Sequence, residues 1–162
     1  MAEQEDHGLT SESLFTFFRE LWEHGLDPFW VCENTPAGWV IVAANPAAQR
    51  VDPRQKKGAR LVHLVAHFPE PDCLIAGYER LLSERRTVTF EQRPVIDDLP
   101  RLFETMLVPI MDAAGNITHA WGMSRDRTKY LNAYNELQAI NERMDEIIQA
   151  KTKELEVANQ KL

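Results

Sequence analysis

The sequence predicts an α+β domain with an antiparallel sheet, preceded by one helix and followed by a long one. Residues with high β-propensity gather in five short segments within residues 29–128. Of the 16 glycines and prolines, 15 lie between Gly25 and Gly122. Beyond them, mostly apolar residues recur at alternating intervals of four and three from Tyr130 to Leu162, as in a long helix. The chain therefore divides into residues 1–28, 29–128 and 129–162.

Composition and charge exclude several classes of protein. The 162 residues are 44% hydrophobic and 27% charged, which is typical of a globular chain and not of a disordered or collagen-like one. A net charge of −7 argues against a nucleic-acid binder. No apolar run is long enough to span a bilayer, and the acidic first six residues differ from a secretory signal. Two cysteines, Cys32 and Cys73, make no disulfide framework, which indicates a reducing, cytoplasmic location.

Residues 1–28 predict one amphipathic helix. Thr10 and Ser11 suit its N-cap, and Gly25 suits the residue after the helix, where a left-handed backbone is common. The apolar side chains between them recur at helical period, at Leu14, Phe15, Phe17, Phe18, Leu21 and Trp22. The polar face is acidic, whereas a membrane-surface helix would present Lys and Arg. We therefore expect the stripe to dock on the domain or on a second chain, and not on a membrane.

The middle of the chain predicts five strands and one main helix. The strands are expected at residues 29–33, 38–44, 87–95, 102–111 and 117–124, and the main helix at residues 73–86. Residues 34–38 and 112–116 are turn sequences between neighbouring strands. Short, weakly periodic segments across residues 46–71 predict small helices. This order is typical of an antiparallel sheet whose helices gather on one side.

Several short motifs stand at matching places in this order. Asn45-Pro-Ala-Ala48 follows the first strand pair, and Gly58-Ala-Arg-Leu-Val-His-Leu64 precedes the main helix. Gly115-Asn-Ile-Thr118 opens the last strand, and Trp121-Gly-Met-Ser-Arg-Asp-Arg-Thr128 ends the domain. In this combination, residues 29–128 resemble a PAS domain, the small sensory module of bacterial signalling proteins. The resemblance implies a PAS-like five-stranded antiparallel sheet with helices on one side.

The resemblance also implies two functional places. A small ligand would lie between the inner face of the sheet and the helices, near Leu82, Phe90, Met106, His119, Trp121 and Met123. The alternative is that these side chains form a filled core, because no residue pattern names a ligand or a cofactor. Asp126 and Thr128 would couple the last strand to the outgoing helix. By their chemistry alone, these two short polar side chains suit a helix cap.

No motif of a catalytic centre stands in the sequence: there is no phosphate-binding glycine loop, nucleophile elbow or Cys-x-x-Cys pair. The chain itself is therefore not expected to be an enzyme. His63 and His67 have the spacing of two metal ligands on a helix, but no third ligand accompanies them. Structural histidines are the first interpretation, and a haem or metal redox sensor is the alternative.

Residues 129–162 predict one helix with a heptad seam. The seam includes Tyr134, Leu137, Asn141, Met144, Ile148 and Leu155. Asn141 occupies an a position, which favours a parallel two-stranded register at some cost in stability. Because this helix cannot bury its stripe alone, we expect a homodimer through the N-terminal and C-terminal helices. The alternative is one long solvated helix.

In the PAS family such a coiled coil leads to an output domain. The sequence stops at Leu162 inside the heptad pattern, so we expect it to be the N-terminal part of a longer protein. Residues 153–162 resemble the linkers that precede GGDEF diguanylate cyclase domains, and histidine kinases use similar linkers. The expected function is a cytoplasmic sensory and dimerisation module. A ligand or partner signal would pass through the coiled coil to one of these output domains.

Overall fold

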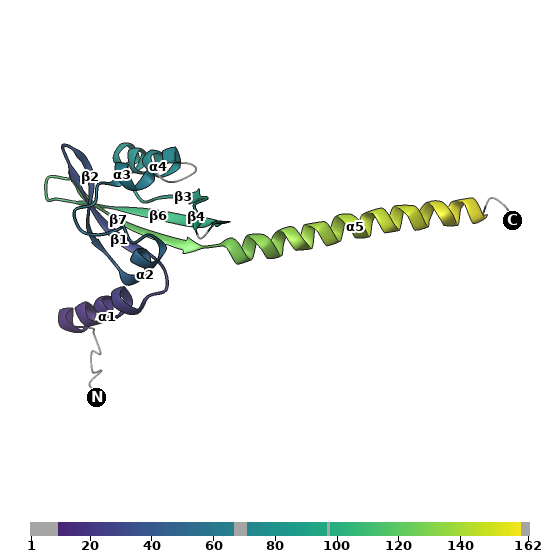
Figure 1. Ribbon diagram of the computed structural model, residues 1–162, viewed down its shortest axis with the longest axis horizontal. Coiled ribbons are helices and arrows are strands. Elements are labelled where there is room, and N and C mark those ends of the chain that lie inside the picture. Colours follow the sequence, from purple (N-terminus) through teal and green to yellow (C-terminus); the bar gives the residue numbers. More distant parts are fainter. Residues whose placement is uncertain (1–9, 67–70, 97, 160–162) are drawn as a thin grey trace, which may run out of the picture. The chain divides into compact units, whose positions relative to one another are not determined.

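The computed structural model of the chain describes residues 10–66, 71–96 and 98–159. The described residues up to Asp126 form one compact unit, and those from Arg127 onwards form a second. The first unit contains the predicted α+β domain and the N-terminal helix, and the second is a single long helix (Figure 1). Among the described residues, none of the helices combines the length and the apolar content that crossing a membrane requires.

Five strands form one antiparallel sheet, as the sequence predicts. They are β1 (Phe29–Thr35), β2 (Gly38–Ala44), β3 (Val88–Gln92), β6 (Phe103–Met111) and β7 (Ile117–Asp126). Their order across the sheet is β2-β1-β7-β6-β3, with every neighbouring pair antiparallel. The first strand of the domain therefore lies beside the last, and β7 is the central strand.

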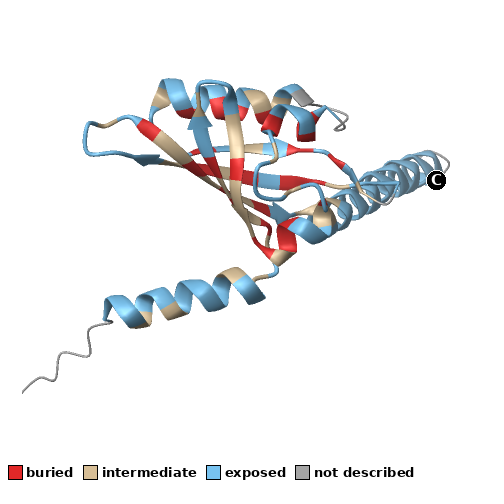
Figure 2. Ribbon diagram, turned by 60° about the vertical axis from the view of Figure 1, so that its left-hand side comes forward, coloured by how far each residue is buried: buried red, intermediate tan, exposed pale blue. Residues whose placement is uncertain are grey.

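The core lies between this sheet and two of the helices. Three helices follow β2, namely α2 (Pro46–Val51), α3 (Leu61–Val65) and α4 (Pro71–Glu84). Helices α3 and α4 lie over one face of the sheet (Figures 1 and 2). Buried side chains from α3, α4 and the strands form one apolar cluster, in which Tyr78, Leu81 and Leu107 are almost completely buried. This burial against a single sheet face is what fixes the register of the strands.

Small residues of β7 make room for large residues of β1 and α4. Ala120, Gly122 and Ser124 are buried, whereas the residues between them are only half-buried. A Cβ atom on Gly122 would lie 2.1 Å from Cε2 of Trp30, so Gly122 allows the indole ring to lie flat on the strand. Trp30 Nε1 in turn donates a hydrogen bond to the Tyr78 hydroxyl at 2.9 Å. The buried indole is thereby held in one orientation.

A second, small hairpin interrupts the strand that the sequence predicts over residues 87–95. Strand β3 ends at Gln92, because Pro94 has no amide hydrogen for the ladder with β6. The chain then forms β4 (Val95–Ile96) and β5 (Leu99–Pro100), which pair with each other. The hairpin is closed by a hydrogen bond from Arg101 N to Pro94 O at 2.9 Å. It forms a two-stranded sheet of its own, and its first strand lines a cavity.

Helix α1 (Ser11–His24) begins where the sequence predicts and ends differently. Oγ1 of the N-cap residue Thr10 accepts a hydrogen bond from Ser13 N at 3.2 Å. The expected left-handed conformation of Gly25 is wrong, because its φ angle is −59°. Glycine is needed there for space, since a Cβ atom would lie 2.4 Å from Leu21 O. No residue of α1 is buried, so its apolar stripe is largely uncovered in the single chain.

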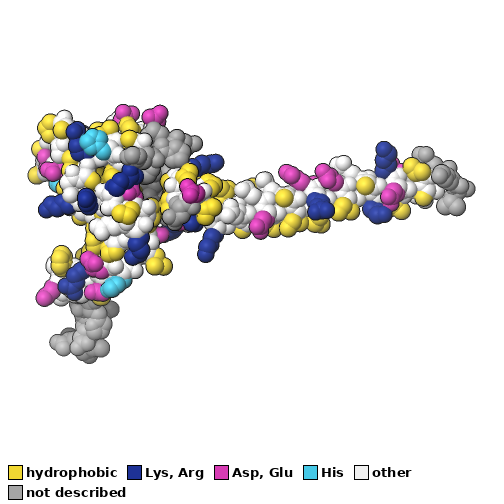
Figure 3. Space-filling model, viewed as in Figure 1, with side chains coloured by type: hydrophobic (Ala, Val, Ile, Leu, Met, Phe, Trp, Pro, Cys, Tyr) yellow, Lys and Arg dark blue, Asp and Glu magenta, His cyan; other side chains and the backbone are white. Residues whose placement is uncertain are grey.

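Helix α5 (Thr128–Asn159) is the predicted long C-terminal helix. No residue between its two ends is buried in the single chain. The predicted seam is open to solvent, with Leu137 60% and Leu155 64% exposed, and apolar side chains follow the helix in Figure 3. A helix with this uncovered stripe gains stability when a second helix covers it.

Candidate ligand-binding site

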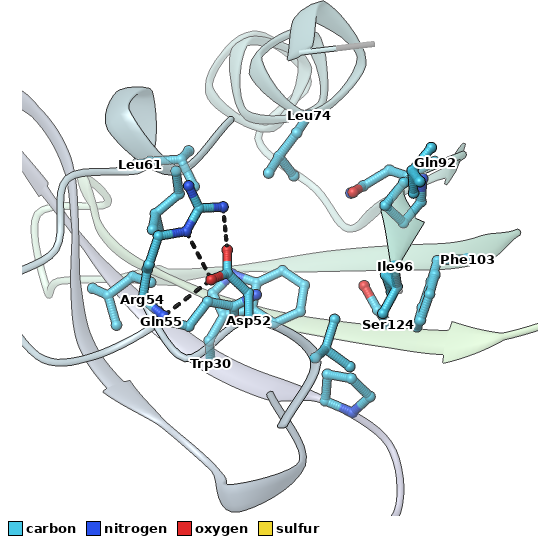
Figure 4. Close-up of a pocket in the computed structure, with 16 residues that line it drawn as sticks. Trp30, Asp52, Arg54, Gln55, Leu61, Leu74, Gln92, Ile96, Phe103 and Ser124 are labelled. Carbon is cyan, nitrogen blue, oxygen red and sulfur yellow. Dashed lines mark hydrogen bonds and ion pairs between the residues drawn. The ribbon is translucent and has the colours of Figure 1, made fainter. Parts of the chain in front are cut away.

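A cavity of about 250 Å³ lies on the helix-covered side of the sheet (Figure 4). Its apolar wall includes Trp30, Ile41, Leu61, Leu64, Leu74 and Phe103. Pro94, Val95 and Ile96, on the strand before the small hairpin's turn, form another side. The remaining wall is polar and comes from Asp52, Arg54, Gln55, Gln92 and Ser124. An apolar space with a few converging polar groups is the usual form of a small-molecule site.

Three buried polar side chains form a hydrogen-bonded chain across β3, β6 and β7. Gln92 Nε2 donates to Thr105 Oγ1 at 3.1 Å. Thr105 Oγ1 also shares a hydrogen bond with Ser124 Oγ at 2.7 Å, and these two residues are direct partners in the β6–β7 ladder. Thr105 is completely buried, and Gln92 and Ser124 are at least nine-tenths buried. Since buried polar groups are costly unless they are paired, this chain fixes the three rotamers.

An ion pair lies in the opposite part of the wall. The Asp52 carboxylate accepts hydrogen bonds from Arg54 N at 3.0 Å, from Arg54 Nε at 2.9 Å and from Arg54 Nη2 at 2.8 Å. Its side chain is 9% exposed, whereas that of Arg54 is 44% exposed. The hydrogen bond to Asp52 raises the pKa of Arg54. The two charges compensate each other, so the lining presents no unpaired charge from either residue.

The six side chains expected near a ligand lie elsewhere. All six are described, and none of them lines the cavity. Leu82 is 40% exposed on α4, and Phe90 packs against Gly77 in the core. The other four occupy the opposite face of the sheet, in β6 and β7, at Met106, His119, Trp121 and Met123. The expected placement of these four is corrected by strand alternation, because the small residues of β7 face the helices.

That opposite face carries an aromatic contact with α1. The Trp121 ring lies 5.5 Å from Trp22 and 5.8 Å from Phe29 between centroids. His119 Nδ1 lies 3.0 Å from Thr118 Oγ1, within hydrogen-bonding distance. The side chains expected to contact a ligand therefore include a contact surface for the N-terminal helix.

The polar cavity residues Gln92, Ser124 and Asp52 are not among those predicted from the sequence. Ser124 could have been predicted from one pattern in the sequence. Ala120, Gly122 and Ser124 alternate along the strand, and their small size suits a face packed against large side chains. Nothing comparable marks Gln92, because its distance from Ser124 depends on the register of three strands.

Only one histidine of the predicted pair belongs to the described residues. His63 lies exposed on α3, and His67 is outside the described residues. No group of three or more His, Cys, Asp or Glu side chains that could hold a metal ion occurs in the part of the chain that the structure describes.

Asp126 and Thr128 stand at the end of β7 and the start of α5. Asp126 Oδ2 lies 3.9 Å from Arg101 Nη1, which follows the small hairpin. In α5 the first backbone hydrogen bond runs from Leu131 N to Arg127 O at 3.0 Å. Thr128 is thus the first residue inside the helix, and Arg127 occupies the cap position. We call Asp126–Thr128 the β7–α5 junction.

The completely buried Cys32 thiol should make stability depend on pH. Burial raises the pKa of Cys32 from its ordinary value of 9.0 to about 11, although a hydrogen bond from the Tyr78 hydroxyl opposes this shift. Burial also raises the pKa of Tyr78. The unfolded chain loses the Cys32 proton near pH 9, and the folded chain keeps it until near pH 11. The free energy of unfolding should therefore fall across this window, by up to about 1.4 kcal/mol per pH unit for one proton.

Urea unfolding at several pH values between 9 and 11 measures this fall. Cys32→Ala should remove the part of the slope that the thiol contributes, while Tyr78 accounts for what is left. Comparing slopes rather than absolute stabilities separates this effect from the small void that alanine leaves. An unchanged slope in Cys32→Ala would show that the thiol is not its cause.

Comparisons with known proteins agree with this architecture. The sequence matches the PAS fold family over residues 28–130, which is more than half of the chain. No match to a curated protein was found. The fold is similar to that of many solved structures, including the following three. The first is an RNA-binding light-oxygen-voltage receptor (TM-score 0.64, 19% identity, 90% of this chain and 41% of that one).

The other two structures are of similar length to this chain's domain. One is a PAS domain from Colwellia psychrerythraea (TM-score 0.57, 18% identity, 72% of this chain and 98% of that one). The other is a sensory box histidine kinase/response regulator from Burkholderia thailandensis (TM-score 0.57, 14% identity, 79% of this chain and 97% of that one). At these identities the likeness concerns the fold, while the family match rests on the sequence itself. The chain belongs to the PAS fold family.

Proposed function

We propose that this chain is the sensory and dimerisation part of a cytoplasmic signalling protein. A small molecule in the cavity alters the β7–α5 junction and thereby the pairing of two α5 helices. The course of β7 is the observation that carries the proposal. Ser124 lines the cavity, and the same strand ends two residues later at Asp126, just before α5 in the chain. A strand that forms the cavity wall transmits a change in occupancy along its own backbone.

The small hairpin supports a second route to the same residue. Val95 and Ile96 line the cavity, and Arg101 closes the hairpin through its bond to Pro94 O. The Arg101 guanidinium also pairs with Asp126. Because both side chains are partly exposed, this ion pair is worth little energetically and exchanges easily. A ligand that moves the hairpin would therefore shift the partner of Asp126 at low cost.

The proposed dimer uses α1 and α5. The seam Tyr134, Leu137, Asn141, Met144, Ile148 and Leu155 supplies a two-stranded coiled coil from α5. The exposed apolar stripe of α1 supplies a second contact. In this arrangement the imperfect core, polar at Asn141 and Lys151, is compatible with two rotational packings of the coil, while Asn141 keeps the register.

The output domain in this proposal is a GGDEF diguanylate cyclase. It is supported by residues 153–162, which resemble the linkers that precede such domains. A histidine kinase is the alternative, supported by the similar fold of the sensory box histidine kinase/response regulator.

Asn141→Ile tests the dimer on which this function depends. Sedimentation equilibrium of the wild-type chain should show a dimer, and Asn141→Ile should lower its dissociation constant by at least about tenfold, because a buried polar pair becomes apolar. Spin-label distances across the dimer should broaden, since Asn141 no longer selects one register.

Asn135→Ile is the matched control, because it makes the same change at a b position outside the seam. It should leave both the dissociation constant and the distance distribution as they are in the wild type. A wild-type chain that sediments as a monomer at high concentration would contradict the seam and the proposed signal route.

A further inference from the structure

The polar wall of the cavity presents an acceptor beside a donor. Gln92 uses its amide nitrogen on Thr105 Oγ1, and its amide oxygen points toward the cavity (Figure 4). Thr105 is completely buried, and its hydroxyl oxygen already accepts the bond from Gln92. The Thr105 hydroxyl proton is then used when Thr105 donates to Ser124 Oγ. The Ser124 hydroxyl proton then remains for a group inside the cavity. Because both side chains bond the same Thr105 oxygen, the acceptor and the donor are neighbours.

Three other residues of the wall already have partners, namely Trp30, Asp52 and Arg54. The Trp30 indole N–H is used on the Tyr78 hydroxyl, so Trp30 offers the cavity a ring surface and not a donor. Asp52 and Arg54 compensate each other through two side-chain hydrogen bonds. A charged ligand would lose its hydration without meeting an unpaired counter-charge from either residue. The lining therefore favours a neutral molecule.

The volume of the cavity and the aromatic rings in its wall restrict the shape of the ligand. A volume of about 250 Å³ lies below the range of about 300–1,000 Å³ that is common for drug-sized ligands. Trp30 and Phe103 supply aromatic surfaces on which a flat ring can pack. A planar molecule of one or two rings meets both conditions.

We infer that the cavity takes a small, neutral, planar molecule with an N–H donor next to a carbonyl acceptor, as in a lactam. The N–H donates to the Gln92 amide oxygen, and the carbonyl accepts from the Ser124 hydroxyl. This assignment rests on the proposed function, because it names the class of signal that the sensor reads.

Three commercially available probes distinguish a lactam from a ligand without the N–H donor and from a charged ligand, all in the wild-type chain. 2-Quinolone carries the N–H and the carbonyl side by side. N-methyl-2-quinolone keeps the shape and the carbonyl but has no donor, and 2-naphthoate has a similar size and a negative charge. Titration followed by amide chemical shifts gives affinity and location together. We expect 2-quinolone to bind at least about tenfold more tightly than either control, with shifts at Gln92 and Ser124.

Variants then test the two contacts. Ser124→Ala and Gln92→Leu should each weaken 2-quinolone binding by about tenfold, because each leaves one polar group of the bound probe without a partner. Glu91→Gln is the matched control, since Glu91 is exposed on the same strand and does not line the cavity. Far-UV circular dichroism checks that each variant is folded. Should Gln92→Leu fail to fold, Ser124→Ala and the probe comparison in the wild type still decide the outcome.

Each contrary result has a distinct meaning. Binding of N-methyl-2-quinolone or 2-naphthoate as tight as that of 2-quinolone overturns the ligand class and leaves the cavity as a sensor site. Binding of 2-quinolone that Ser124→Ala and Gln92→Leu leave unchanged overturns the assigned contacts. If none of the three probes binds, the ligand class is overturned, while the signalling role is decided separately by the sedimentation of the dimer.

Discussion

Gly122→Ala will destabilise the folded domain by about 3 kcal/mol, at the upper end of the cost of overpacking a core. The added Cβ atom would lie 2.1 Å from Trp30 Cε2 and 2.4 Å from both Cζ2 and Nε1. The indole is 6% exposed and cannot move outward without breaking its hydrogen bond to Tyr78. The loss of that bond accounts for about 1 kcal/mol of this cost. Urea unfolding followed by far-UV circular dichroism measures the change.

A double-mutant cycle with Trp30→Leu identifies the cause. Leucine removes the atoms that the new methyl group meets, so Gly122→Ala should cost less than about 1 kcal/mol in that background. Met123→Leu, at the neighbouring position of β7 on its other face, controls for a general sensitivity of the strand. An equal loss from Gly122→Ala in both backgrounds would mean that the contact with Trp30 is not responsible.

Asn45→Ala will cost the domain about 3 kcal/mol, because one side chain connects three segments. Asn45 is completely buried, and its Oδ1 accepts hydrogen bonds from Phe29 N at 2.9 Å and from Ala48 N at 2.8 Å. Its Nδ2 donates to Asp27 O at 3.0 Å. Alanine removes the N-cap of α2, worth about 1 kcal/mol, and leaves buried backbone groups unpaired at about 1–3 kcal/mol each.

The conservative variant Asn45→Asp separates these contributions. Compared at a pH at which the buried carboxyl group is protonated, aspartate keeps the two bonds that Oδ1 accepts and buries no charge, so its loss should be about half that of alanine. Hydrogen exchange at the Phe29 and Ala48 amides should accelerate in Asn45→Ala and much less in Asn45→Asp. Equal losses in the two variants would show that the accepted bonds do not carry the stability.

The sheet could be predicted from the sequence because its signals are local. Runs of β-branched and aromatic residues mark the strands, and the motif that begins at Asn45 marks a helix start. The face that each strand presents could not be derived in the same way. Both faces of β7 carry residues that can be buried, and only the docking of Trp30 against Gly122 selects one.

The cavity was less predictable than the sheet, since its polar wall is assembled from distant strands. Thr105 reaches Gln92 and Ser124 only because β6 lies between β3 and β7 in this register. The small hairpin is a further case, because Pro94 signals the end of a ladder and says nothing of the pairing that follows. The dimer seam, in contrast, is a local pattern that stays a prediction until its oligomeric state is measured.

The placement of the tryptophans gives the protein its own optical reporters. Trp30 stands in the cavity wall, so its emission is sensitive to what occupies the cavity. Trp22 and Trp121 form an edge contact between α1 and the sheet, so their coupling is sensitive to the docking of that helix. Single replacements by phenylalanine assign each signal to one place. Occupancy of the cavity and attachment of the N-terminal helix can therefore be followed in the same cuvette, without a label.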